Sequence, residues 1–201
     1  MTTLTLQKGQ NLTLDKVDPG LKVVRIGAGW DPNQYHSGST YDVDISAFLL
    51  GEDNKVVKFP GKQAGVDSFL FYNQESLLNG AVVHSGDNRT GEGDGDDESI
   101  IITLDKLPKE VKRIVFVVTI HDAELKGQNF GQIPNTWVNL YNNETDQKLA
   151  MSELTEEFST ETAMVPAELY IHNDVWKFKA LGAGYNGGLF QFCQDFGVQL
   201  G

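Results

Sequence analysis

Short segments with strand-forming patterns recur along the whole chain, and they restrict the fold more than any other feature of the sequence. In the segment 41–50, YDVDISAFLL, Asp42 and Asp44 fall on one face of an expected strand, and Val43 and Ile45 fall on the other. Gly, Asn and Asp separate such segments at short intervals, as is typical of β-sandwiches. We therefore predict a mainly β fold, with two sheets packed as a β-sandwich.

Two further segments complete the expected architecture. The segment 113–122, RIVFVVTIHD, is almost continuously apolar, which indicates a strand buried on both faces. Near the C-terminus, Leu189, Phe192, Cys193 and Phe196 have helical spacing, and a glycine follows them as a stop signal. We predict a few short helices, including this one. No linker divides the 201 residues, so we expect a single domain over residues 1–201.

The most unusual stretch is residues 86–98, GDNRTGEGDGDDE, which lies between the expected strands AVVH and SIIITL. We call it the acidic tract. It holds six acids, one base and four glycines. Two like charges about 4 Å apart repel by about 4 kcal/mol at the effective dielectric of a protein surface. The acidic tract is therefore either an extended, solvated loop or a binding site for a hard cation.

The acidic tract matches neither of two common calcium-binding patterns. Beginning the EF-hand pattern at Asp87 places Arg89 where an oxygen ligand is required, and beginning at Asp94 places Glu98 and Ser99 in the last two slots. The calcium-binding nonapeptide pattern needs repeats, whereas GEGDGDDE occurs once. Carboxylates with little imidazole and no thiolate nearby favour Ca²⁺ over zinc or copper, and Mg²⁺ is less favoured.

Oxygen atoms from other parts of the chain could converge on the acidic tract. Asp31 stands at a strand end, Asp42 and Asp44 share one strand face, and Asn73 follows the strand segment SFLFY. On the residues alone, Asp42 and Asp44 are more simply explained as an ordinary solvent-facing pair. The two explanations remain open at this point.

Charge and chain composition exclude several classes of partner. The formal net charge of −12 argues against nucleic acid or an anionic membrane, which need clustered Lys and Arg. The N-terminus, MTTLTLQKGQ, lacks the basic start and apolar core of a signal peptide, and no run of about 18 apolar residues could form a transmembrane segment. We therefore expect a cytoplasmic protein. The single cysteine, Cys193, excludes an internal disulfide and a thiolate cluster.

The sequence carries no strong catalytic signature. It has no G-x-S-x-G elbow, its four histidines show no ligand spacing, and its G-A-G triplets do not form G-x-G-x-x-G phosphate loops. The enzymatic alternative is a Mg²⁺- or Mn²⁺-dependent hydrolase, or a nucleotide-binding protein, that uses the same acidic residues. A hydrolase also needs a convergent base and a pocket, which the sequence does not display.

Several segments together resemble the TerD family of tellurite-resistance and stress-response proteins. Tyr41 and Val43 stand where the family commonly has Phe and Leu, and the segment KFPGKQAGV before Asp67 is less typical. The segments that carry the resemblance are GAGWD at 27–31, YDVDISAFLL at 41–50, FYN at 71–73, HSGDNRTGEGDGDDE at 84–98, VFVVTIHDAE at 115–124, STETAM at 159–164, and ELY with WKFKALGAGYNGG after it.

The resemblance implies a β-sandwich that binds Ca²⁺ through acidic loops and has no established enzymatic activity. It also implies a role in tellurite resistance or stress response, in which Ca²⁺-ordered loops bind other proteins of the same system. Direct reduction of tellurite is poorly supported, because Cys193 stands alone and no redox motif is visible. With this resemblance, the expected metal ligands are Asp31, Asp42, Asp44, Asn73, Asp87, Asn88, Glu92, Asp94, Asp96, Asp97 and Glu98.

Overall fold

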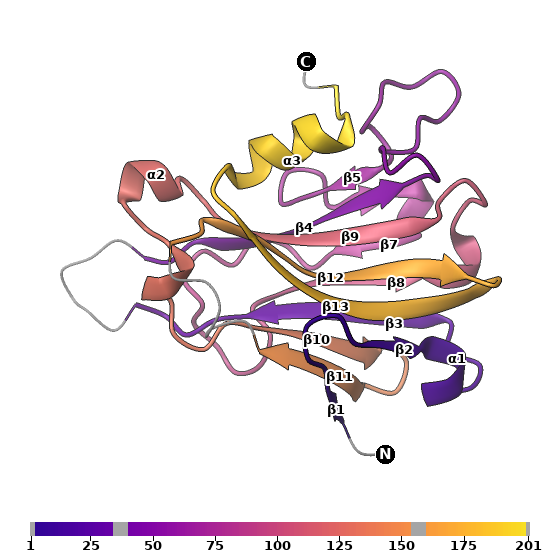
Figure 1. Ribbon diagram of the computed structural model, residues 1–201, viewed down its shortest axis with the longest axis horizontal. Helices are drawn as coiled ribbons and strands as arrows, with labels where there is room; N and C mark the ends of the chain where they lie inside the picture. Colours follow the sequence, from indigo (N-terminus) through magenta and orange to yellow (C-terminus); the bar gives the residue numbers. More distant parts are fainter. Residues whose placement is uncertain (1–2, 34–39, 154–159, 200–201) are drawn as a thin grey trace.

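The computed structural model describes residues 3–33, 40–153 and 160–199, and it shows two β-sheets packed against each other (Figure 1). Ser159, the first residue of the STETAM segment, lies outside the described residues. The first sheet has the strand order β1-β11-β10-β3-β8-β7-β6 and the second has the order β2-β13-β12-β9-β4-β5. Neighbouring strands are antiparallel except for β1 and β11, which are parallel.

The strands vary in length from two residues at the sheet edges to eleven in β13. The strands of the first sheet are β1 (Leu4–Thr5), β11 (Gln147–Glu153), β10 (Trp137–Asn142), β3 (Val23–Gly29), β8 (Glu98–Thr103), β7 (Val82–His84) and β6 (Ser76–Leu77). Those of the second sheet are β2 (Asn11–Thr13), β13 (Val175–Tyr185), β12 (Ala163–His172), β9 (Arg113–Ile120), β4 (Val43–Leu50) and β5 (Phe69–Leu70).

Short helices lie in the connections between strands of the described chain, and one helix follows the last of these strands, β13. Three are α-helices, α1 (Leu14–Val17), α2 (Ala123–Lys126) and α3 (Gly188–Phe196), and three are 3-10 helices, η1 (Leu78–Gly80), η2 (Leu104–Lys106) and η3 (Phe130–Gln132). Helix α3 ends at Phe196, and the next residue, Gly197, has a φ of 77° and so adopts the left-handed conformation that glycine favours. The predicted mainly β fold of two sheets, with a few short helices including one near the C-terminus, is confirmed.

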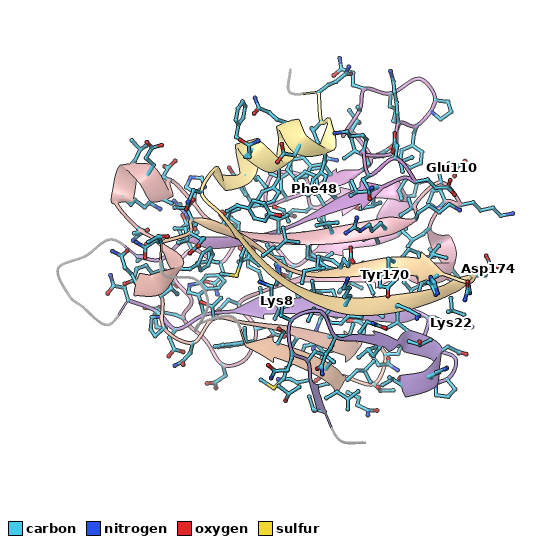
Figure 2. The ribbon with its side chains drawn as sticks, in the orientation of Figure 1. Lys8, Lys22, Phe48, Glu110, Tyr170 and Asp174 are labelled. Atoms are coloured by element: carbon cyan, nitrogen blue, oxygen red, sulfur yellow. The ribbon has the colours of Figure 1, made fainter. Side chains whose placement is uncertain are left out.

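The alternation of β4 divides its side chains between two hydrophobic clusters. Ile45 and Leu49 face the core between the sheets, whereas Phe48 faces outward and belongs to a second cluster that includes Phe192 and Cys193 of α3. Figure 2 shows Phe48 beneath α3, and the rings of Phe48 and Phe196 lie 4.9 Å apart. Because α3 covers this outer face, β4 and the neighbouring strand β9 are buried on both faces, as predicted for residues 113–122.

The loops that carry the predicted site meet at one end of the sandwich. In the sheets, Asp44 of β4 pairs with Thr119 near the end of β9, and Glu98 at the start of β8 pairs with Ala28 near the end of β3. The acidic tract enters β8 at this end, and α2 follows β9 there (Figure 1). No helix in the described part of the chain is long and apolar enough to cross a membrane.

Candidate metal centre

Three of the predicted ligands come together at the start of β4. Asp42 precedes the strand, Asp44 is its second residue, and Asp87 lies in the acidic tract. One carboxylate oxygen from each of the three lies within 4.8 Å of the other two. We call these three residues the acid cluster. Asp42 and Asp44 lie on one strand face, as the alternation predicted, but that face is covered and is not a solvent-facing one.

Burial gives the acid cluster unusual electrostatics. Asp42 is 5% exposed and Asp44 is 3% exposed, whereas Asp87 is exposed. Burial, together with the negative charges of Glu98, Asp42 and Asp87, raises the pKa of Asp44 from 3.8 to about 8. Such a carboxyl holds its proton at neutral pH unless a cation takes the proton's place. The negative charges of the acid cluster are therefore unfavourable together, and the surrounding basic side chains neutralise them only in part.

Three basic side chains approach the acid cluster at distances longer than a hydrogen bond. Lys126 Nζ of α2 lies 3.6 Å from Asp42 Oδ2, and Arg89 Nε of the acidic tract lies 3.7 Å from the same oxygen. His121 Nδ1 lies 3.8 Å from Asp44 Oδ2. Arg89 is largely exposed, so its contact with Asp42 contributes at most about 1 kcal/mol. These contacts leave Asp44 without a strong cationic partner among the described residues.

Glu98 anchors the acidic tract and does so from a fully buried position. Its Oε2 accepts a hydrogen bond from the backbone N–H of Ile45 at 2.9 Å, and its Oε1 accepts one from the N–H of Asn88 at 3.0 Å. His84 Nε2 lies 3.5 Å from Oε2 and 3.0 Å from the Ile45 carbonyl oxygen. Burial lowers the pKa of His84, but the hydrogen bond and negative charge of Glu98, with smaller contributions from the Ile45 carbonyl and Glu75, together raise it above its ordinary value.

Asp97 and Asn88 shape the turn of the acidic tract. Asp97 Oδ2 accepts from the backbone N–H of Trp30 at 2.9 Å, and its Oδ1 accepts from Asn88 Nδ2 at 3.1 Å. Asn88 Oδ1 accepts from the backbone N–H groups of Thr90 and Gly91 at 3.1 and 3.2 Å. Burial raises the pKa of Asp97, the Trp30 hydrogen bond opposes this, and the neighbouring carboxylates reinforce it.

Asp96 fastens the acidic tract to the first sheet. Its Oδ1 accepts hydrogen bonds from Trp137 Nε1 at 3.0 Å and Asn139 Nδ2 at 2.6 Å, both in β10. The side chain crosses over Gly27 so closely that a Cβ atom there would lie 2.0 Å from Asp96 Oδ2. Gly91 is comparably constrained, because a Cβ atom would lie 2.4 Å from Trp30 Nε1. The backbone of these glycines thus makes room for the docked tract.

The remaining predicted ligands lie outside the acid cluster. Glu92 and Asp94 are exposed in the acidic tract, and Asn73 is exposed in the turn between Phe71 and Gln74. Asp31 Oδ2 accepts a hydrogen bond from Asn135 Nδ2 at 2.7 Å. Of the eleven predicted residues, the structure thus gathers three into one cluster, uses four to hold the tract in place, and leaves four on loops around it.

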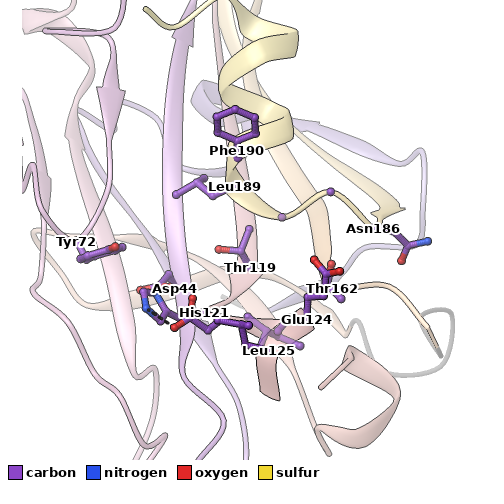
Figure 3. A pocket seen from close by; sticks show the side chains of 15 residues that line it. Asp44, Tyr72, Thr119, His121, Glu124, Leu125, Thr162, Asn186, Leu189 and Phe190 are labelled. Atoms are coloured by element: carbon purple, nitrogen blue, oxygen red, sulfur yellow. Dashed lines mark ion pairs between the residues drawn. The ribbon is translucent and has the colours of Figure 1, made fainter. Parts of the chain in front are cut away.

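Sequence reasoning did not assign Lys126 or His121 to this site. Lys126 carries no signal in the sequence, because only the fold of β9 and α2 brings it to Asp42. His121 directly follows β9, and its proximity to Asp44 depends on the register that pairs Asp44 with Thr119. His121 also lines a pocket of about 470 Å³, and Figure 3 shows Asp44 and His121 in its wall.

The fold and the site define a two-sheet β-sandwich with a buried carboxylate cluster beneath a docked acidic loop. A match to the TerD domain extends over residues 1–196. The chain therefore belongs to the TerD family, which confirms the resemblance seen in the sequence.

Relatives along the full length carry names from tellurium resistance and general stress response. The chain is 48% identical over 199 residues to General stress protein 16U of Bacillus subtilis (strain 168), covering 99% of this chain and 100% of that protein. It is 47% identical over 196 residues to Tellurium resistance protein TerD of Serratia marcescens, covering 98% of both chains. The family is thus one of tellurium resistance and general stress proteins.

A solved structure shares the fold. A homologue of telluride resistance protein (TerD) from Streptomyces coelicolor A3(2) superimposes with a TM-score of 0.70 at 24% identity, covering 90% of this chain and 100% of that one. At this identity the likeness concerns the fold alone.

Proposed function

We propose that this protein is a Ca²⁺-binding, non-enzymatic module of tellurium resistance and general stress response that acts in the cytoplasm. Its acidic loops, ordered by Ca²⁺, present a surface to other proteins of the same system. The observation that carries the proposal is the acid cluster, in which the buried carboxyls of Asp42 and Asp44 face Asp87 from the acidic tract.

The dimensions and chemistry of the acid cluster fit Ca²⁺. Metal–oxygen distances of about 2.3–2.6 Å allow two ligand oxygens to lie up to about 5 Å apart across the ion. The three oxygens of the acid cluster lie within 4.8 Å of one another, so one ion can reach all three. Hard carboxylate oxygens suit Ca²⁺, which takes further oxygens from backbone carbonyls or water. The bound ion supplies positive charge that ties the acidic tract to β4.

The alternative, a Mg²⁺- or Mn²⁺-dependent hydrolase or nucleotide-binding protein, is less well supported by the charges around the acid cluster. The neighbouring pocket is lined by three acids, Asp44, Asp122 and Glu124, and its described lining contains no Lys or Arg. A phosphoester or nucleotide would meet the negative charge of these acids there, without a Lys or Arg of the described lining to pair with its phosphate. Turnover of phosphoesters in Mg²⁺ or Mn²⁺ would favour the hydrolase.

Calorimetric titration with Ca²⁺ tests the proposal. The parent protein should bind Ca²⁺, and Asp42→Asn and Asp87→Asn should each weaken binding at least tenfold by removing a ligand charge. Asp94→Asn is the matched control, because Asp94 is an exposed acid of the same tract outside the acid cluster. Absence of binding by the parent would overturn the proposal. Loss of binding in Asp94→Asn, with Asp42→Asn unaffected, would move the site into the exposed part of the tract.

A further inference from the structure

The pocket beside the acid cluster exposes large apolar side chains at its rim. Its described lining runs from the end of β9 through α2 on one side and through the start of α3 on the other. Leu125 of α2 is 87% exposed and Phe190 of α3 is 61% exposed, the two highest values among the large apolar residues described. Figure 3 shows these two side chains at opposite ends of the pocket, with Thr119 between them.

The same pocket is negatively charged. Asp44 lies in its wall, and Asp122 and Glu124 flank it from the start of α2. Asp122 lies 3.6 Å from His121, and Glu124 forms no ion pair within the described parts of the chain. Asp122 and Glu124 lie outside the acid cluster, so their charges remain available to an occupant of the pocket with or without Ca²⁺. The pocket therefore favours a cationic occupant whether or not the metal is bound.

We propose that this pocket docks a short segment of a partner protein in which Lys or Arg side chains stand next to aliphatic or aromatic ones. The apolar side chains of the segment would cover Leu125 and Phe190, and its cationic groups would pair with Asp122 and Glu124. Exposed apolar side chains around a pocket of about 470 Å³ are suited to anchoring such a segment. The inference rests on the proposed function only in that it takes the ligand to be a protein.

Selection of peptides from a randomised display library on the full-length protein tests this inference. Selection is carried out with Ca²⁺ and separately with chelator, and enriched peptides are then synthesised and titrated. We expect enriched sequences to combine Lys or Arg with Leu, Ile, Phe or Trp. Their affinity should fall at least tenfold in the double variant Leu125→Ser, Phe190→Ser and severalfold in Glu124→Lys, whose charge is reversed.

Matched controls separate the pocket from the rest of the surface. Leu4→Ser removes another exposed apolar side chain, in β1, and Glu110→Lys reverses an exposed acid far from α2 (Figure 2). Both controls should bind the peptides like the parent. Enrichment of acidic or purely neutral peptides, equal binding by the pocket variants, or no enrichment at all would overturn the inference. Dimerisation of the protein through Leu125 and Phe190 would overturn it as well.

We call the pocket beside the acid cluster the docking pocket. The two experiments distinguish the absence of peptide binding there from the absence of Ca²⁺ binding at the acid cluster. Calorimetry with Ca²⁺ reports on the acid cluster alone, and peptide binding in chelator reports on the pocket alone. Peptide binding that persists in Asp42→Asn, a variant expected to lose Ca²⁺, would support the pocket independently of the metal. If the parent bound Ca²⁺ normally but bound no peptide, the proposed metal site would be supported and the proposed docking pocket would be refuted.

Discussion

Replacing Asp44 by Asn should stabilise the metal-free protein at pH 8, although it removes a ligand of the proposed metal site. Burial and the carboxylates of Glu98, Asp42 and Asp87 raise the pKa of Asp44 to about 8, whereas the ordinary value is 3.8. Between these values the folded chain holds a proton that the unfolded chain has lost. The contribution of Asp44 to stability is therefore complete below about pH 4 and is lost as the pH rises through about 8.

The size of this effect follows from the difference between the two pKa values. A rise from 3.8 to about 8 corresponds to about 6 kcal/mol, because one pKa unit is about 1.4 kcal/mol. Asn cannot ionise, but it still buries a polar amide, so we expect about half of this figure, or about 3 kcal/mol, to be regained at pH 8. For a chain of this size, about 3 kcal/mol shifts the melting temperature by about 6–12 °C.

Thermal unfolding followed by circular dichroism checks this prediction at pH 5 and pH 8, in chelator and in Ca²⁺. In chelator, the advantage of Asp44→Asn over the parent should be larger at pH 8 than at pH 5. In Ca²⁺ the order should reverse, because only the parent gains stability from the bound ion. Asp94→Asn, an exposed control, should follow the parent throughout. A lower melting temperature for Asp44→Asn in chelator at pH 8 would refute the reasoning.

Three further predictions concern the docking of the acidic tract and the buried thiol. Gly27→Ala should lower the free energy of unfolding in urea by about 3 kcal/mol, because the new Cβ displaces Asp96 and breaks its two hydrogen bonds to β10. Glu98→Gln should lower the pKa of His84, measured by NMR titration, because the charge and hydrogen bond that raise it are weakened; an unchanged pKa would contradict this. Burial raises the pKa of Cys193 to about 11, so the native thiol should react with a thiol reagent at pH 8 at least about 100-fold more slowly than the urea-unfolded chain.

The sequence predicted those features that depend on local periodicity. Alternation placed Asp42 and Asp44 on one face of β4, the continuous apolar run indicated the doubly buried strand β9, and helical spacing located α3. Each of these signals lies within one segment, so no knowledge of the tertiary structure is needed to detect it. The family resemblance added the expectation that Asp42 and Asp44 act as ligands, which periodicity could not supply.

The sequence could not predict which acids of the acidic tract hold it in place and which one joins the acid cluster. These roles depend on contacts between residues that are far apart in the sequence. Asp96 bonds to Asn139, 43 residues away, and Asp97 bonds to the backbone of Trp30, 67 residues away. A count of charges treats these acids and the exposed Asp94 alike. The need for glycine at position 27 could not be predicted either. It arises because the side chain of Asp96 crosses over Gly27.

Lys126 contacts the acid cluster and is adjacent in sequence to Leu125, which lines the proposed docking pocket. Lys126 Nζ lies 3.6 Å from Asp42, and its neighbour Leu125 in the one-turn helix α2 lies at the rim of the pocket. A divalent cation bound to Asp42 repels the lysine, so we infer that Ca²⁺ releases Lys126 and shifts α2. NMR should then show Ca²⁺-dependent methyl shifts at Leu125 in the parent, and smaller ones in Lys126→Met, which keeps an apolar stem without the charge. Equal shifts in both proteins would contradict this coupling.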